Sequence, residues 1–203
     1  DQHRVVLDDA DRRDHGDAPV LQKAVGRPDY IPRTIAKARS SAESQRACKL
    51  TDVGNARRLV LRYGDKLRYC APWKSWLVWS GSRWEIDRTG QITERAKETV
   101  HSIYAQAADI PDATRRAEFI EAVRRQESAT RIDAMVRLAR SEPGVPVVPG
   151  QLDDEPWKLN AANGTIDLIS GDLLPHNPDD LITKLAPVDF VPRARSQAFE
   201  DFL

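Results

Sequence analysis

The sequence predicts an α+β protein that is predominantly helical and carries short β-hairpins, preceded by a partly flexible N-terminal segment. Three observations lead to this class. Apolar residues recur at helical spacing in several stretches after residue 50, two strand-like runs flank a Ser-Gly-Ser turn, and Asn-Gly and Ser-Gly pairs mark turns near the C-terminus. The first 50 residues contain neither Trp nor Phe, so they offer little material for a core.

Charge is segregated along the chain, although its 31 basic and 31 acidic side chains cancel. Residues 1–22 carry six Asp and three Arg, whereas residues 23–49 carry seven basic and two acidic side chains. We interpret residues 1–49 as a flexible or weakly helical lead-in or linker, and residues 50–203 as a compact domain. The chain opens at Asp1 rather than Met, and we expect it to be part of a longer protein.

A helix is expected to open the domain, with Thr51 as its N-cap and Gly64 as the residue that ends it. Its apolar residues recur on one helical face, at Val53, Ala56, Val60 and Tyr63. The run Trp76–Asp87 then predicts a β-hairpin, because two strand-like runs flank Ser80-Gly81-Ser82. The domain is therefore expected to begin with a helix followed by a hairpin.

Three further helices are predicted from apolar residues at helical spacing. The first is expected to end near Pro111 and the third before Pro143. Their apolar positions are Ile92, Ala96, Val100, Ile103 and Ala107 in the first helix, Ala117, Ile120 and Val123 in the second, and Ile132, Met135, Val136 and Ala139 in the third. These helices make the domain predominantly helical.

A second antiparallel unit is predicted in the run Asn163–His176, where Asn163-Gly164 and Ser170-Gly171 mark turns. Residues 181–191 are expected to be extended and confined to a sheet edge, because Pro187 and Pro192 cannot donate to a ladder. Trp157 precedes this unit and is expected to be a buried packing anchor.

No motif for catalysis or cofactor binding is present in the sequence. A G-x-x-x-x-G-K-[ST] phosphate loop is absent, and the four His residues are scattered without the paired spacing of a zinc site. Cys48 and Cys70 are interpreted as two reduced thiols. We therefore expect no catalytic residue, metal or cofactor in this chain. No uncharged apolar run approaches the ~18–20 residues that span a bilayer, so we expect no membrane partner and a cytoplasmic location.

A basic and aromatic stretch is the best candidate for binding. Its candidate DNA-binding residues are Arg57, Arg58, Arg62, Lys66, Arg68, Lys74, Trp73 and Trp76. Exposed Trp beside Lys and Arg is typical of single-strand binding, in which bases stack and phosphates are neutralised. Arg57, Arg58 and Arg62 are expected on the solvent side of their helix. Two alternatives stay open: the indoles form a local core, and the cations form a solvated face.

The acidic C-terminal part contrasts with this stretch, because residues 150–203 carry ten acidic and four basic side chains. Such a balance is expected to repel phosphate, so any nucleic acid must contact the chain through a local patch. DNA contact therefore depends on where the cations between residues 57 and 74 lie.

The order of several segments resembles a known family. These segments are TDVGNARRLVLRYGDKLRYC (Thr51–Cys70), WKSWLVWSGSRWEID (Trp73–Asp87), AKETVHSIY (Ala96–Tyr104), ESATRIDAMVRLARSEPGV (Glu127–Val145), PWKLNAANGTIDLISGDLLPH (Pro156–His176) and DLITKLAPVDF (Asp180–Phe190). Together they look like the domain that precedes the superfamily-three helicase in phage and plasmid primase–helicases, shared with the poxvirus primase–helicase. The resemblance covers residues 50–203.

This resemblance implies a non-catalytic connecting and assembly segment of a phage or prophage DNA replication protein, with a primase before it and a hexameric helicase ATPase after it. ATP and Mg²⁺ are expected only in the helicase domain, whose ATPase motifs are absent from these 203 residues. The implied partners are DNA, the adjoining primase and helicase domains, and other copies of the chain in a helicase ring. The alternative is a protein–protein interaction module that does not contact DNA.

Overall fold

The computed structural model describes residues 41, 43–195, 197, 201 and 202. The chain divides after residue 43, and residues 44–203 form its second unit. Most of the expected lead-in lies outside the described residues, so the account below concerns the second unit.

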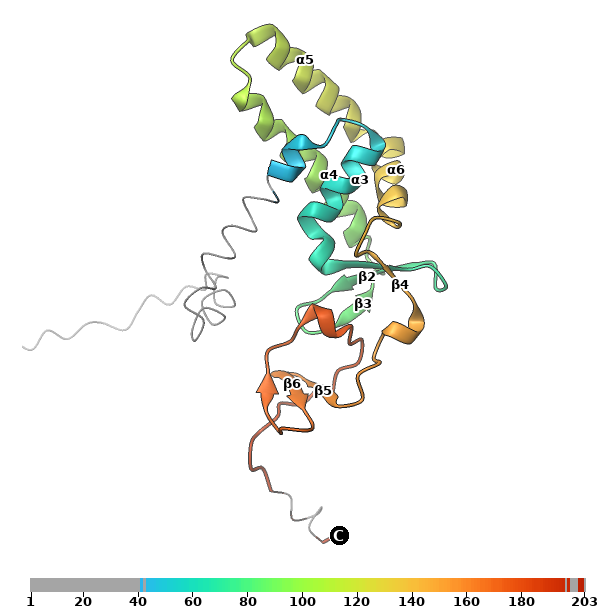
Figure 1. Ribbon diagram of the computed structural model, residues 1–203, viewed down its shortest axis with the longest axis vertical. Coiled ribbons are helices and arrows are strands. Elements are labelled where there is room, and N and C mark those ends of the chain that lie inside the picture. Colours follow the sequence, from blue (N-terminus) through green and yellow to red (C-terminus); the bar gives the residue numbers. More distant parts are fainter. Residues whose placement is uncertain (1–40, 42, 196, 198–200, 203) are drawn as a thin grey trace, which may run out of the picture. The chain divides into compact units, whose positions relative to one another are not determined.

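The expected fold class is confirmed, because the second unit combines several helices with two small sheets (Figure 1). Its helices are α3 (Asp52–Tyr63), α4 (Gln91–Ile103), α5 (Ala113–Arg124) and α6 (Ala129–Ala139). The first sheet has the order β3-β2-β1-β4, built from β1 (Leu67–Cys70), β2 (Ser75–Trp79), β3 (Trp84–Ile86) and β4 (Pro146–Val147). The second has the order β5-β6-β7, built from β5 (Lys158–Ala161), β6 (Gly164–Asp167) and β7 (Leu173–Leu174).

Helix α3 begins and ends as the sequence predicts. The Thr51 hydroxyl accepts a hydrogen bond from the Gly54 amide at 3.1 Å and so satisfies one free donor of the first turn. The buried face differs from the predicted one at its first position, because Val53 is exposed whereas Arg58 and Leu59 are buried. Residues 45–49 lie against the first turns of α3 and cover this part of the helix.

The first sheet combines two pairings between neighbouring strands with one long-range pairing. The predicted hairpin is confirmed: β2 and β3 are antiparallel, and the Ser80 amide donates to the Arg83 carbonyl at 3.0 Å to close the turn. The sequence pattern does not predict β1 or β4. Strand β1 pairs antiparallel with β2, the next strand along the chain, and parallel with the two-residue β4, which is distant in the chain. Pairing with other strands rather than periodicity within the segment defines β1 and β4.

Alternate residues of the first sheet build a core on each of its faces. On one face, Leu67, Tyr69, Trp76 and Val78 belong to the cluster that contains residues of α3, α4 and α6. On the other face, Cys70, Leu77, Trp84 and Val147 pack with Leu152 and Leu181. The helices therefore cover one face of the sheet, and chain from the C-terminal part covers the other (Figure 1).

Helices α4 to α6 occupy the predicted positions, with one change at the end of α4. The predicted apolar pattern runs to Ala107, but the α-helix ends at Ile103 and a 3₁₀ segment, Tyr104–Asp109, follows. None of the helices in the described part of the chain is long and apolar enough to cross a bilayer.

The second sheet confirms the predicted antiparallel unit, with Leu159 opposite Ile166 and Thr165 opposite Leu174. The extended edge expected over residues 181–191 is reduced to one isolated parallel bridge between Ala161 and Ala186. The predicted burial of Trp157 is wrong, because 57% of this residue is exposed.

Candidate nucleic-acid interface

Arg58 lies in the interior, so its expected position on the solvent side of α3 is wrong. Only 2% of the residue is exposed. Its guanidinium donates to the carbonyl oxygens of Gln45 at 3.0 Å, Lys49 at 3.1 Å and Cys48, and to Oδ1 of Asn55 at 2.9 Å. Burial lowers the pKa of the Arg58 guanidinium. This side chain fastens residues 45–49 to α3 and is not available to a ligand.

The other two predicted cations of α3 are exposed, but acidic groups lie near both. Arg57 Nε is 3.7 Å from a carboxylate oxygen of Glu142. Arg62 Nε donates to the Tyr63 hydroxyl at 3.0 Å, and this hydroxyl donates to Glu98 at 2.6 Å. The positive charges of Arg57 and Arg62 are therefore partly compensated by Glu142 and Glu98.

The cations around β1 are dispersed rather than gathered. Lys66 precedes the strand and Lys74 follows it, and both side chains are exposed. Arg68, between them, lies 4.8 Å above the Trp84 ring and donates to the Gly64 carbonyl at 2.6 Å. Burial lowers the pKa of Arg68, while Asp179 and Asp65 act in the opposite direction. The six predicted cations do not form one patch.

The tryptophans divide between core and surface. Trp76 is 7% exposed and packs against the Tyr69 ring with 5.3 Å between centroids, and Trp84 is buried. For these two indoles the core interpretation is therefore the correct one. Trp73 is 42% exposed, in the turn between β1 and β2. It is the predicted aromatic residue that a ligand can reach.

A cleft of about 510 Å³ lies beside Trp73, and we name it the aromatic cleft. Its lining residues are Trp73, Leu77, Arg83, Trp84, Glu85, Ile86, Arg88 and Thr183. Leu77, Trp84 and Ile86 belong to strands β2 and β3, which form the floor, and Thr183 comes from the C-terminal part. The cleft thus joins an apolar surface to three charged side chains.

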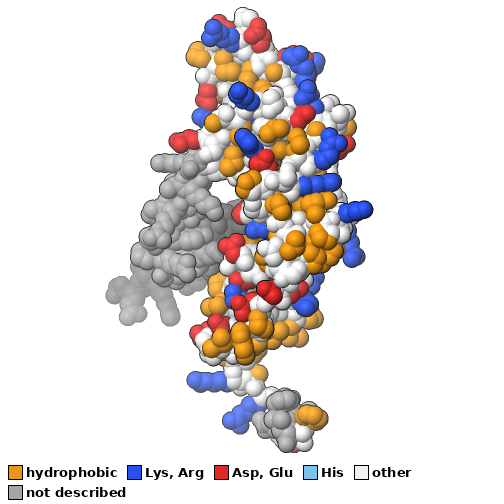
Figure 2. Space-filling model, turned by 45° about the vertical axis from the view of Figure 1, so that its right-hand side comes forward, with side chains coloured by type: hydrophobic (Ala, Val, Ile, Leu, Met, Phe, Trp, Pro, Cys, Tyr) orange, Lys and Arg blue, Asp and Glu red, His pale blue; other side chains and the backbone are white. Residues whose placement is uncertain are grey.

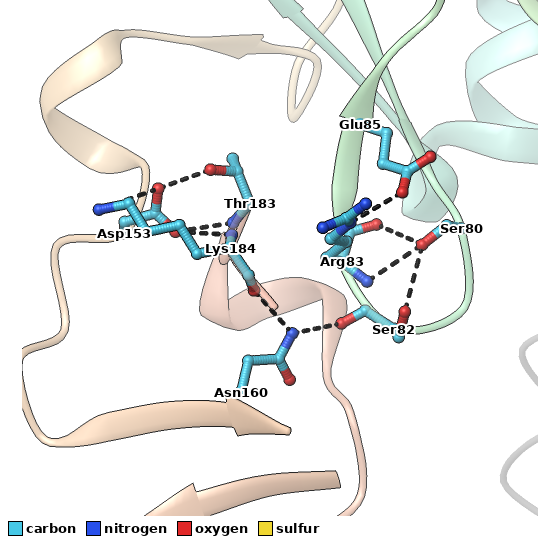
Figure 3. Close-up of polar contacts among 8 residues, drawn as sticks. All are labelled: Ser80, Ser82, Arg83, Glu85, Asp153, Asn160, Thr183 and Lys184. Carbon is cyan, nitrogen blue, oxygen red and sulfur yellow. Dashed lines mark hydrogen bonds and ion pairs between the residues drawn. The ribbon is translucent and has the colours of Figure 1, made fainter. Parts of the chain in front are cut away.

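The wall at Thr183 is held by hydrogen bonds that cross the chain (Figure 3). Asp153 accepts from the Thr183 amide at 2.7 Å and from its hydroxyl at 2.6 Å. Asn160 Nδ2 donates to the carbonyl oxygens of Lys184 at 3.0 Å and Ser82 at 2.9 Å. These bonds position the 183–184 segment against the β2–β3 turn before any ligand binds.

Two cations line the cleft, and one of them is paired with an acidic side chain. Arg83 Nε is 2.8 Å from a carboxylate oxygen of Glu85. Arg88 is exposed, and so is Lys74, which follows Trp73 in the chain but does not line the cleft; neither forms an ion pair with any residue the structure describes. The sequence pattern points to Lys74 and places Arg83 near it, but Arg88 and Thr183 reach the site only through the folding of β3 and the C-terminal part. No local signal marks them.

A larger cleft of about 850 Å³ lies between α4 and α6. Its rim carries both charges, including Arg62 and Lys97 beside Glu127 and Asp133. This mixture offers no net attraction for a polyanion, so the cleft is a weaker candidate for nucleic acid. Within the described residues, no group of His, Cys, Asp and Glu side chains is placed to hold a metal ion.

A family model described as "D5 N terminal like" matches residues 56–203. A search of the curated proteins found no match to the chain.

Proposed function

The chain belongs to the D5 N-terminal-like family, the domain that precedes the superfamily-three helicase in phage and plasmid primase–helicases, and we propose that it binds single-stranded DNA in the aromatic cleft. The domain is associated with DNA replication through this family. A single strand is the expected ligand class there, because its unpaired bases can leave the stack and enter a cleft. The observation that carries the proposal is the exposed Trp73 ring in a cleft that is also lined by Arg88, a cation with no ion-pair partner among the described residues.

The chemistry of the cleft suits one or two nucleotides. Trp73 offers a face on which a base stacks, and Ile86 adds exposed apolar surface on the floor. Lys74 and Arg88 supply charge for the phosphates on either side of that base. Glu85 neutralises Arg83 in the free protein, so Arg83 contributes to binding only when the strand draws it away.

In the parent protein, this domain joins priming to unwinding and assembles with other copies of itself in the helicase ring. The primase and helicase domains supply the catalysis, and ATP and Mg²⁺ act in the helicase domain. The proposed location is the cytoplasm, where the DNA of a phage or plasmid replicates. A strand held in the aromatic cleft is then near the site of unwinding, which is the advantage of a connecting domain that binds DNA.

A protein–protein interaction module without DNA contact is the second candidate. The observation that favours it is an exposed apolar face on the second sheet, on which Trp157, Leu159 and Leu168 are exposed. Such surfaces commonly mark protein interfaces. DNA binding by the isolated chain separates the two candidates.

The test is fluorescence anisotropy of a labelled single-stranded oligonucleotide with the 203-residue chain at low salt. We expect Trp73→Ala to raise the Kd about fivefold or more, because stacking on one aromatic residue is worth ~1–3 kcal/mol per base. Trp157→Ala is the matched control, since Trp157 is also exposed but lies on the second sheet. Its Kd should equal that of the wild type.

Two outcomes would contradict the proposal. The first is an absence of binding by the wild-type chain at low salt. This result would favour the second candidate, a protein–protein interaction module without DNA contact. The second is a Trp73→Ala variant that binds as tightly as the wild type, which would place any DNA contact outside the aromatic cleft. Circular dichroism of each variant establishes that it is folded.

A further inference from the structure

The end of the first sheet that carries the turn between β1 and β2 gathers cations from different parts of the chain. Tyr69 of β1 lies opposite Trp76 of β2, and the Asp87 amide donates to the Trp76 carbonyl oxygen at 2.9 Å, so these three residues form one row across the sheet. Lys74 precedes β2 and Arg88 follows Asp87 in the chain. Both cations therefore lie just beyond this row, at the same end of the sheet.

Helix α6 brings further positive charge to this end. The Arg140 Cζ atom lies 4.8 Å from the centroid of the Tyr69 ring, which belongs to the helix-covered face of the sheet. Arg140 directly follows the last residue of α6, and Arg137, three residues earlier, shares its side of the helix. Arg88 lines the aromatic cleft on the other face. The turn between β1 and β2 thus separates cations on the two faces of the sheet.

The α6 cations differ from those of α3, because they lack a counter-ion. Arg137 and Arg140 are both exposed, and neither forms an ion pair with any residue in the described part of the chain. Glu142, the acid closest to Arg140 in the sequence, lies beside Arg57 instead. In Figure 2, Lys and Arg side chains gather along the right-hand edge, at the height of the helices and the first sheet. Exposed cations of this kind attract a polyanion.

We propose that a single strand of DNA leaves the aromatic cleft over the turn between β1 and β2 and continues along Arg140 and Arg137 of α6. This inference rests on the proposed function, because the strand starts at Trp73. Neighbouring strands of a sheet are ~4.8 Å apart, so the path from Arg88 beside β3 to Arg140 beside β1 spans at least about 10 Å. Successive phosphates of a stacked strand rise by only ~3.4 Å, so separate phosphates contact the cations along this path.

The role of the α6 pair differs from that of the aromatic cleft. Contacts from Arg side chains to phosphates position a strand without reading its bases, whereas stacking in the cleft engages a base. Each neutralised phosphate of a single strand contributes about 0.7 to the slope of log affinity against log salt, so Arg137 and Arg140 together contribute about 1.4. A strand confined to the cleft does not reach them and lacks this contribution.

The test is fluorescence anisotropy of a labelled single-stranded oligonucleotide of about twelve nucleotides with the 203-residue chain over a salt series. Arg137→Gln with Arg140→Gln should raise the Kd about tenfold at low salt and make the slope shallower by about 1.4. Arg137→Lys with Arg140→Lys keeps both charges, so its slope should equal that of the wild type. Arg137→Gln alone should make the slope shallower by about 0.7, and it leaves the contact between Arg140 and Tyr69 intact.

Arg115→Gln with Arg125→Gln is the matched control, because it removes the same net charge at exposed positions of α5 and the turn that follows it. Its Kd and slope should equal those of the wild type. The proposal is overturned if the Gln pair on α6 binds with the wild-type slope, if the Lys pair loses as much slope as the Gln pair, or if the control weakens binding as strongly. Circular dichroism establishes that each variant is folded.

Failure of this inference is distinguishable from failure of the proposed function. If Trp73→Ala weakens binding while the Gln pair on α6 leaves the slope unchanged, the strand occupies the aromatic cleft and the path along α6 is refuted. If the wild-type chain does not bind the oligonucleotide at low salt, both proposals are refuted.

Discussion

Asn160 Nδ2 donates to the Ser82 carbonyl oxygen at 2.9 Å and joins the second sheet to the turn between β2 and β3 (Figure 3). The same nitrogen donates to the Lys184 carbonyl, while Oδ1 accepts from the Thr165 hydroxyl and lies 2.8 Å from Nδ1 of His176. The polar atoms of this buried side chain are thus all engaged. One amide in β5 holds the β2–β3 turn and the C-terminal wall of the aromatic cleft together.

Asn160→Ala should lower the free energy of unfolding by about 2–4 kcal/mol, because it removes the donor of two backbone carbonyls and leaves a buried void. Urea denaturation of both proteins measures the change. Asn163→Ala is the control: Asn163 also bonds twice to one distant residue, Phe190, but at an exposed position. A loss as large in the control would contradict the special role of Asn160.

Arg58→Ala should destabilise the chain by at least about 2 kcal/mol, because three backbone carbonyls of residues 45–49 lose their donor. Arg57→Ala, one residue away and exposed, should change stability by less than about 0.5 kcal/mol. Thermal and urea unfolding compare the two. Equal stability of both variants would show that the interior position of Arg58 is wrong.

Gly54→Ala should destabilise α3, although the same change in a free helix stabilises by roughly 1 kcal/mol. A Cβ atom at residue 54 would lie 2.0 Å from the Lys49 carbonyl oxygen, and backbone cannot move aside as a flexible side chain does. Gly150→Ala is the control, since a Cβ there meets nothing within 4 Å. Urea denaturation should show a lower free energy of unfolding than that of the wild type for Gly54→Ala but not for Gly150→Ala.

Asp87 caps the start of α4 and should make stability depend on pH. Its carboxylate accepts from the backbone amides of Thr89, Gly90, Gln91 and Ile92. Burial raises the pKa of Asp87, but these four donors outweigh it and hold the pKa below its ordinary value. The contribution is therefore present above the unfolded-state pKa of ~3.9 and is lost as pH falls through the folded-state value.

Asp87→Asn should consequently be less stable than the wild type at neutral pH, by about 1 kcal/mol, a magnitude typical of helix capping. The difference should shrink as the pH of urea denaturation is lowered below the ordinary range of aspartate. If the difference in free energy of unfolding between the two proteins stays constant as the pH falls, the charge of Asp87 does not contribute to stability.

The salt dependence of DNA binding should report how many cations contact phosphate. If Lys74, Arg83 and Arg88 each neutralise one phosphate of a single strand, log affinity should fall with log salt at a slope of about −2. Arg88→Ala should make that slope shallower by about 0.7, whereas Arg57→Ala should leave it unchanged. A slope that Arg88→Ala does not alter would remove Arg88 from the interface.

Local features of the sequence determined much of the fold. The Thr51 cap, the Ser80–Ser82 turn and the helical spacing of α4 to α6 are all found where the pattern predicts them, because each depends on residues within a few positions of one another. The family was also visible in the sequence, since it rests on the order of segments over residues 56–203.

The tertiary structure alone decided which side chains are available to a ligand. Arg57 and Arg58 are neighbours in a basic helix, yet residues 45–49 bury one and leave the other in solvent. Trp76 packs on Tyr69 while Trp73 lies open beside Thr183, and Trp157 is 57% exposed although the sequence predicts a buried anchor there. Exposure depends on what other parts of the chain bring into contact, and local periodicity carries no information about those partners.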